Sequence, residues 1–195
     1  MGRRALAVAC HVGDWAHCEM LVAATVAEFG RIDVLVNNAG IAPVPPSLKE
    51  VTSDLFDKTI AVNLKGPLRL SALAADHMPA GSAIINISSK ASTHPSPFTV
   101  VYAAAKAGLN ALTTAASQEF GPRGIRVNGI ICGTFDTDSF RASIPTDEAW
   151  QAATARPIVG RVAGADEIVG TALYLASDAS SYMTGQMVVL DGGSR

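Results

Sequence analysis

Apolar positions along the chain follow two different spacings, and these spacings predict the order of the structural elements. Strand-length apolar runs, rich in β-branched residues, occur at 5–10, 32–36, 83–88, 125–131 and 186–190. Between them, apolar residues recur every three or four positions, which predicts helices at 15–29, about 52–78, about 99–120 and about 166–176. Asp14 is placed to cap the first helix and Gly30 to end it, and Thr52 or Ser53 to cap the second. The segment 132–164 has no strong periodicity until about Asp147.

Strands that alternate with helices of this length predict βαβ units and a parallel sheet. We therefore expect an α/β fold, a Rossmann-like doubly wound parallel sheet, with residues 1–195 in a single domain. Ligands of such sheets bind at the carboxyl ends of the strands. Residues 37–40, Ser89 and residues 132–137 each follow a different predicted strand, so we expect one site where they meet.

Composition narrows the classes of partner. Hydrophobic residues make up 49% of the chain and charged residues 16%, which suits a buried parallel sheet. The net charge is −2, from 15 basic and 17 acidic residues without a basic stripe, so we expect no nucleic-acid partner. No apolar run reaches the roughly 18 residues that a membrane span needs. The three cysteines form no CxxC motif, which favours a reduced, cytoplasmic setting. The spacing of the nearby His and Cys residues at 10–18 does not converge on one face, and we expect no metal site.

A proton-transfer site is predicted between the third strand and the helix that follows it. Tyr102 and Lys106 are separated by four positions and therefore share a helix face. A nearby cation favours the phenolate, so we expect Lys106 to lower the pKa of Tyr102. Ser89, thirteen residues before Tyr102, is placed to hold a carbonyl or alcohol oxygen against the phenol.

These residues belong to a longer ordered set of motifs. Its members are Asn37-Asn38-Ala39-Gly40, Asn63, Ser89, Tyr102-Ala103-Ala104-Ala105-Lys106, Arg126-Val127-Asn128, Gly133 to Thr137 and Asp191-Gly192-Gly193. No single piece is specific, but the set, in this order and at this spacing, resembles the short-chain dehydrogenase/reductase family over nearly the whole chain.

The resemblance implies a role for each matching residue. Tyr102 would be the general acid/base, Lys106 would lower its pKa and hold the nicotinamide ribose, and Ser89 would orient the substrate oxygen. Asn63 would bind a water that links Lys106 to solvent. NAD or NADP would carry the hydride. The residues implied to bind the cofactor are Val12, Asn37, Ala39, Gly40, Tyr102, Lys106, Gly133, Phe135 and Thr137.

The resemblance also implies the kind of partner. The substrate would be a small-molecule secondary alcohol or ketone, covered by the segment from Phe140 to Trp150. The chain would assemble as a homodimer or homotetramer. Two residues near this site have plainer explanations. His94 suits a solvated loop better than a substrate contact, and Cys132 suits a buried structural cysteine better than a reactive thiol.

The sequence departs from the family pattern at its beginning. The family's first βαβ unit, with its glycine-rich TGxxxGxG turn for the pyrophosphate, has no counterpart here, so we expect an incomplete family domain. His11 stands where the family usually has an aspartate, and Cys132 replaces a usual proline. The strand at 32–36 should have an unpaired apolar edge. The segment from residue 1 to about 13 should pair with that edge or be disordered.

Two functions remain open at this point. One is an NAD(P)-dependent oxidoreductase that uses Tyr102, Lys106, Ser89 and Asn63. The other is a catalytically silent chain that acts only by associating with related subunits.

Overall fold

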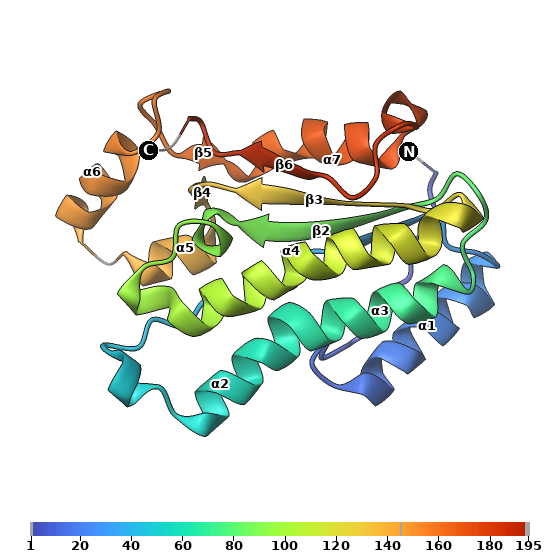
Figure 1. Ribbon diagram of the computed structural model, residues 1–195, viewed down its shortest axis with the longest axis horizontal. Helices are drawn as coiled ribbons and strands as arrows, with labels where there is room; N and C mark the ends of the chain where they lie inside the picture. Colours follow the sequence, from blue (N-terminus) through green and yellow to red (C-terminus); the bar gives the residue numbers. More distant parts are fainter. Residues whose placement is uncertain (1, 145, 194–195) are drawn as a thin grey trace.

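A parallel sheet of four strands forms the centre of the computed structural model, which describes residues 2–144 and 146–193 (Figure 1). The strands are β1 (Val34–Asn37), β2 (Ala83–Ser89), β3 (Arg126–Cys132) and β6 (Met187–Leu190), and their spatial order is β1-β2-β3-β6. All three pairings are parallel, and the register places Ser89 opposite Cys132. The four corresponding strand predictions are confirmed, with ends that differ by one or two residues.

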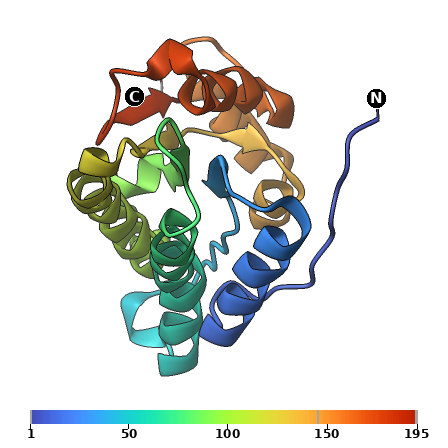
Figure 2. The ribbon, with the colours of Figure 1, turned by 90° about the vertical axis from the view of Figure 1, so that its right-hand side faces the viewer.

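Helices cover both faces of this sheet. The helices α1 (Trp15–Phe29), α3 (Gly66–Ala75) and α4 (Val100–Phe120) pack on one face, and α7 (Val169–Ala176) packs on the other (Figures 1 and 2). Successive strand residues point to opposite faces, so Ile84 joins the core under α1, α3 and α4, whereas Ile85 joins the core under α7. Burial on both faces explains why the strands read as continuous apolar runs. The predicted α/β fold is confirmed.

The predicted helix starts have the expected caps. The Asp14 carboxylate accepts hydrogen bonds from the backbone N–H groups of Ala16 and His17, at 2.8 and 3.2 Å. Gly30 ends α1 in the left-handed region, with φ of 83°. Thr52 caps α2 (Ser53–Ile60) by accepting from the N–H of Leu55 at 3.2 Å.

The second predicted helix is not continuous. A π-helical turn, η2 (Ala61–Lys65), separates α2 from α3, and α3 ends at Ala75 rather than near Met78. Pro67 has no N–H to donate to the carbonyl of Asn63, four residues earlier, which favours a departure from α-helical bonding at this point. Such turns widen the helix by one residue and occur often at functional sites. Here the turn contains Asn63.

The predicted strand at 5–10 is wrong. The segment is extended, but it forms no strand with any described residue, and it runs along α1 instead of pairing with β1 (Figure 2). Arg4 lies 3.4 Å from the Glu28 carboxylate near the end of α1, and the Cys10 thiol donates to the His17 carbonyl near its beginning. A strand needs a neighbour within hydrogen-bonding distance, and the sheet offers none in this position. The expected unpaired apolar edge is confirmed, because β1 pairs only with β2 among the described residues, and its Val34 and Val36 are 40% and 46% exposed.

The segment expected to lack periodicity contains short elements. The two-residue strands β4 (Phe135–Asp136) and β5 (Ala163–Gly164) pair in parallel. Between them in the sequence lie the helices α5 (Asp138–Ser143) and α6 (Asp147–Ala155). Short 3₁₀ turns complete the structure: η1 (Leu48–Glu50), η3 (Lys90–Ser92), η4 (Pro97–Thr99), η5 (Gly121–Arg123), η6 (Ala165–Ile168) and η7 (Asp178–Ser180). Among the described residues, no helix combines the length and the apolarity that crossing a membrane requires.

Candidate active site

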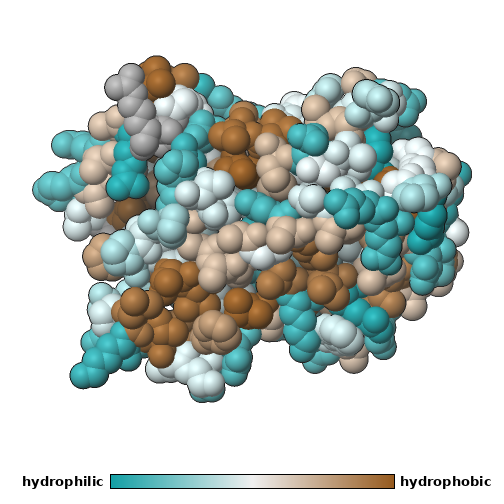
Figure 3. Space-filling view, viewed as in Figure 1, coloured by the Kyte–Doolittle hydropathy of each residue, from teal (hydrophilic) through white to brown (hydrophobic). Residues whose placement is uncertain are grey.

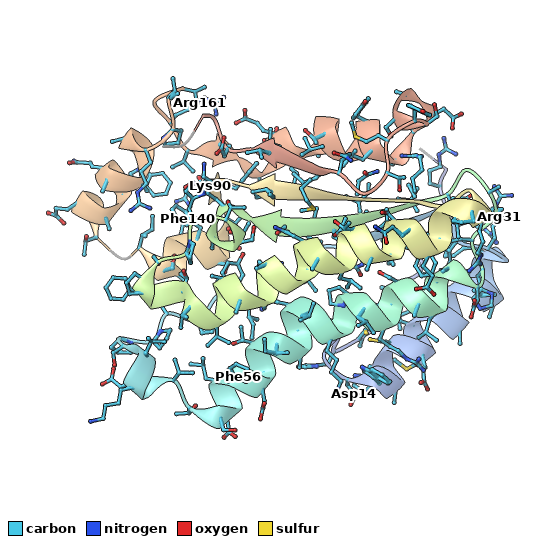
Figure 4. All side chains as sticks on the ribbon, in the orientation of Figure 1. Asp14, Arg31, Phe56, Lys90, Phe140 and Arg161 are labelled. Atoms are coloured by element: carbon cyan, nitrogen blue, oxygen red, sulfur yellow. The ribbon has the colours of Figure 1, made fainter. Side chains whose placement is uncertain are left out.

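A cleft of about 760 Å³ opens at the carboxyl ends of the central strands. Its floor includes Ser89 at the end of β2, Cys132 at the end of β3, and Tyr102 and Lys106 on α4. Gly40, in the turn after β1, lines it as well. Figure 4 shows this end of the sheet, marked by the labelled side chains of Lys90 and Phe140, which also line the cleft. The structure therefore brings together residues from Gly40 to Phe140, which lie 100 positions apart in the sequence.

Lys106 is buried in the cleft floor, with only 4% of its surface exposed. Its Nζ donates a hydrogen bond to the carbonyl of Ile87 on β2, at 2.7 Å. The same Nζ lies 5.7 Å from the centroid of the Tyr102 ring. Burial disfavours the charged ammonium and lowers the pKa of Lys106 to about 8.

The expectation that Lys106 lowers the pKa of Tyr102 is not met in this structure. Burial raises the pKa of Tyr102 above its ordinary value, and a side-chain hydrogen bond with Ser89 offsets only part of that rise. The Nζ of Lys106 donates to the Ile87 carbonyl, and desolvation of the phenolate is the largest cause of the Tyr102 pKa shift. Tyr102 is therefore a neutral phenol at pH 7, in contact with the Ser89 hydroxyl.

Asn63 holds the turn after β1 from behind the cleft. It is fully buried, and its Nδ2 donates to the carbonyls of Ile41 and Thr59, both at 2.9 Å. Its Oδ1 accepts from the N–H of Ile41 at 3.2 Å. A Cβ added to Gly40 would lie 3.0 Å from this Oδ1 and 3.6 Å from the Nζ of Lys106, so a side chain at that position would crowd Asn63. The side chain of Asn63 thus ties the turn at Ile41 to α2 and keeps Gly40 near Lys106.

The residues implied to bind the cofactor divide into two groups. Gly40, Tyr102, Lys106, Gly133, Phe135 and Thr137 line the cleft, whereas Val12, Asn37 and Ala39 are not among its lining residues.

The side chain of Asn37 points into the protein interior. Its Nδ2 donates to Asn86 at 2.8 Å and to Ser71 at 3.2 Å. The carbonyl of Val12 accepts from the Cys18 thiol at 3.2 Å, and Gly66 leaves space for it. Asn37 and Val12 therefore form contacts within the fold and do not line the cleft.

Cys132 lies beside Lys106 in the cleft floor. Burial raises its pKa to about 11, and the neighbouring lysine opposes this only in part. Cys132 is therefore a protonated thiol at neutral pH, which agrees with a structural cysteine and not with a reactive one.

Sequence reasoning missed the charged residues of the cleft wall. Lys90 lines the cleft and pairs with Asp191, whose carboxylate lies 2.7 Å from the lysine Nζ. Its position directly after Ser89 at the end of a strand was an available signal. Arg156 lines the cleft as well. It follows α6, and nothing in the local sequence indicates that α5 and α6 carry it back to the site.

The segment predicted to cover the substrate lies partly over the cleft. Phe140 and Ser143 line the cleft, whereas Trp150 packs against Phe140 with ring centroids 6.2 Å apart. Exposed apolar side chains continue around this end of the molecule, where Figure 3 shows hydrophobic surface over the start of α2 and the adjacent loops. They include Val44, Leu48, Phe56 and Phe98.

Comparisons relate the chain to known oxidoreductases. The family model described as enoyl-(acyl carrier protein) reductase matches residues 1–195. An uncharacterized oxidoreductase of Thermotoga maritima is 38% identical over 182 residues, which cover 90% of this chain and 72% of the relative. This chain belongs to the short-chain dehydrogenase/reductase family. The predicted family is confirmed, and so is the prediction that the chain belongs to a family of oxidoreductases.

Two further family members carry names that mention a nicotinamide cofactor. An L-rhamnose 1-dehydrogenase (NAD(P)(+)) of Azotobacter vinelandii is 37% identical over 195 residues, which cover 98% of this chain and 76% of that one. A solved structure of a blue fluorescent protein from a metagenomic library, in complex with NADPH, is 32% identical with a TM-score of 0.92. That match covers 98% of this chain and 76% of the solved one. This chain thus spans about three quarters of the length of these family members.

Proposed function

We propose that this chain interconverts a secondary alcohol and a ketone, with NAD or NADP as the hydride carrier and Tyr102 as the general acid/base. The observation that carries the proposal is the meeting of Ser89, Tyr102 and Lys106 in one cleft, with the Lys106 Nζ 5.7 Å from the centroid of the tyrosine ring. The dehydrogenase name of the Azotobacter vinelandii relative supports the reaction class and the cofactor.

The cleft fits the nicotinamide end of such a cofactor. Gly40 presents backbone without a side chain next to Lys106, which leaves space for a ribose against the lysine ammonium. Phe135 and Thr137 line the same cleft. A bound nicotinamide supplies the hydride, which no side chain can supply. The sequence contains no glycine-rich turn, so the described residues account for the nicotinamide end and not for the pyrophosphate.

The protein groups then handle the proton. In the reducing direction the Tyr102 phenol donates its proton to the carbonyl oxygen, and the Ser89 hydroxyl donates a hydrogen bond to the same oxygen. In the oxidising direction Tyr102 accepts the proton from the alcohol. The Lys106 ammonium, 5.7 Å from the ring centroid, stabilises the phenolate while it exists. Asn63 acts as a positioning residue for Gly40, and its predicted water contact stays a prediction.

The proposal is tested by cofactor binding and turnover in this chain. NADH and NADPH are titrated while cofactor fluorescence is followed, and oxidation of a panel of secondary alcohols is then measured. Tyr102→Phe removes only the phenolic oxygen, and we expect a loss of at least roughly 1000-fold in kcat, within the range for removing a general acid/base. Tyr182→Phe, at a fully exposed tyrosine, is the matched control. Activity retained in Tyr102→Phe would refute the proposed role.

The same titration decides whether the chain is catalytically silent. The 195 residues contain no glycine-rich turn, and each charge-assisted phosphate contact that such a turn makes is worth roughly 1.5–3 kcal/mol. Binding of NADPH in the micromolar range counts against the silent alternative. An absence of binding together with an absence of turnover supports a chain that acts only by association.

We further propose that the chain forms a homodimer or homotetramer in a reduced, cytoplasmic setting. Exposed apolar side chains on α7, at Val169, Leu173 and Tyr174, support association. The three cysteines are all free thiols, which supports the reduced setting. Light scattering coupled to size-exclusion chromatography measures the oligomeric state directly, and a monomer at all concentrations would contradict the association.

A further inference from the structure

The charged residues that line the cleft are all basic. Lys90, Lys106 and Arg156 line it, and no aspartate or glutamate appears among its described lining residues. This contrasts with the whole chain, whose formal net charge is −2. A cleft lined by charges of one sign concentrates the electrostatic potential and raises the local concentration of ions of the opposite sign.

Two of these cations already have assigned partners. Lys106 faces Tyr102 and donates to the Ile87 carbonyl, and Lys90 pairs with Asp191 at 2.7 Å. Arg156 is different, because its side chain forms no hydrogen bond and no ion pair with any residue that the structure describes. The guanidinium stays charged at every physiological pH, and its planar donors match a carboxylate or phosphate in a two-point contact.

Three carboxylates in the elements around the cleft already pair with other basic residues. Each pairs with a different basic residue: Asp136 with Arg141, Glu167 with Arg161, and Asp191 with Lys90. Among the described residues, no carboxylate forms an ion pair with Arg156, and the cleft has a basic side chain on the side formed by the segment after α6.

We propose that Arg156 is a specificity-determining residue that binds an anionic group, a carboxylate or a phosphate ester, on the substrate. The substrate is then a secondary hydroxy acid or hydroxyalkyl phosphate, or the matching keto compound. Its reacting oxygen lies at Tyr102 and Ser89, while its anion lies at Arg156. This inference deepens the proposed oxidoreductase function and rests on it for the reaction, but not for the binding.

Binding is therefore measured separately from turnover. Isothermal titration at fixed ionic strength compares 3-hydroxybutyrate with its neutral amide, 3-hydroxybutyramide, and with propane-1,2-diol 1-phosphate. We expect the wild-type protein to bind at least one anionic probe roughly 10- to 100-fold more tightly than the amide, the range expected for a contact to a charged group. The anion that binds more tightly identifies the preferred group.

Three variants locate the effect. Arg156→Gln should remove the preference for the anions and leave the affinity for the amide unchanged. Arg156→Lys should keep part of the preference, because it retains the charge but loses the two-point geometry. Arg161→Gln changes a neighbouring arginine that does not line the cleft, and it should behave as wild type. Where the chain turns over, the Arg156→Gln change should appear in KM and not in kcat.

The outcomes separate this inference from the proposed function. Anion binding that depends on Arg156 without any turnover leaves the inference standing and removes the proposed reaction. Turnover of charged and neutral alcohols alike, unaffected by Arg156→Gln, removes the inference and leaves the reaction standing. An equal affinity for all three probes overturns the inference. A loss of NADPH affinity in Arg156→Gln with the substrate preference intact also overturns it, since Arg156 would then serve the cofactor.

Discussion

Tyr102 and Lys106 show how burial sets the chemistry of single residues in this cleft. Both are removed from water, and burial shifts both toward their neutral forms: the pKa of Tyr102 is raised and that of Lys106 is lowered to about 8. A neutral phenol beside a hydroxyl is ready to give up a proton to a carbonyl oxygen. In the reverse direction the phenolate is scarce at pH 7, so alcohol oxidation should accelerate as the pH rises.

The pH dependence of ketone reduction follows from these shifts. Reduction needs a proton on Tyr102 and a cation at Lys106. Tyr102 keeps its proton through mildly alkaline pH because its pKa is raised, whereas Lys106 loses its charge as the pH rises through about 8. We expect kcat/KM for reduction to be flat below pH 7 and to fall above pH 8, by up to about tenfold per pH unit.

The variant Lys106→Arg tests whether loss of the Lys106 charge causes the fall in kcat/KM above pH 8. Arg stays protonated, so Lys106→Arg should move the falling limb to higher pH, whatever its effect on the rate at pH 7. Lys65→Arg, whose ammonium lies over the Trp15 ring, is the control and should leave the profile unchanged. An identical falling limb in Lys106→Arg and wild type would assign the limb to another group.

At the scale of the elements, the N-terminal segment is held by close backbone packing. Gly66 is the first residue of α3. A Cβ added to it would lie only 2.5 Å from the carbonyl oxygen of Val12. The glycine therefore permits the approach of residues 2–13 to the helix. This contact explains why the segment has a defined path without belonging to the sheet.

Gly66→Ala should detach this segment. Alanine favours a helix over glycine by up to about 1 kcal/mol, but here the Val12 backbone must move to accommodate the methyl group. We expect a lower melting temperature and faster amide exchange or trypsin cleavage at residues 2–13. Gly170→Ala on α7, where a Cβ meets no atom within 4 Å, should instead stabilise the protein by up to about 1 kcal/mol. Equal melting temperatures for the two variants would show that the contact at Gly66 does not hold the segment.

The elements that sequence predicts correctly are those specified by local signals. The helices α1 and α4 have helical periodicity, and Asp14 and Gly30 mark the ends of α1, so neighbouring residues are sufficient to predict them. The error at 5–10 has the opposite cause. Its apolar pattern is that of a strand, but strand formation depends on a distant partner, and the sheet places none beside it.

In the candidate active site, too, local signals predict some features, and others depend on how distant segments pack. The face shared by Tyr102 and Lys106 follows from their spacing, and the place of Ser89 follows from the strand that it ends. The direction of the Tyr102 pKa shift depends on burial, which the sequence does not state, and the prediction was therefore wrong. The place of Arg156 depends on how α5 and α6 pack, and no pattern within the segment 132–164 indicates it.

At the scale of the whole molecule, the sheet has an unprotected side. β1 pairs with β2 on one side and has no strand partner on the other among the described residues. Its backbone groups there are free to bond with another chain, and its exposed valines add apolar surface. Edges of this kind promote association unless a charge or a covering element blocks them. This edge and the apolar surface of α7 are two separate candidate contact regions, and they predict different kinds of assembly.

A single substitution to lysine can show which of these two regions causes association. Val36→Lys places a charge on the β1 edge, and we expect it to reduce concentration-dependent light scattering while it changes the free energy of unfolding by no more than about 0.5 kcal/mol. Leu68→Lys introduces the same charge at a similarly exposed position on α3, where no strand edge is present, and it should scatter as wild type does. Suppression by both variants would point to general solubility and not to strand pairing.

If Val36→Lys removes the large aggregates but a defined dimer or tetramer persists, the edge causes the aggregation, and the ordered assembly uses another surface. Val169→Lys should then dissociate that assembly if it forms through α7, because the variant charges the apolar surface of that helix.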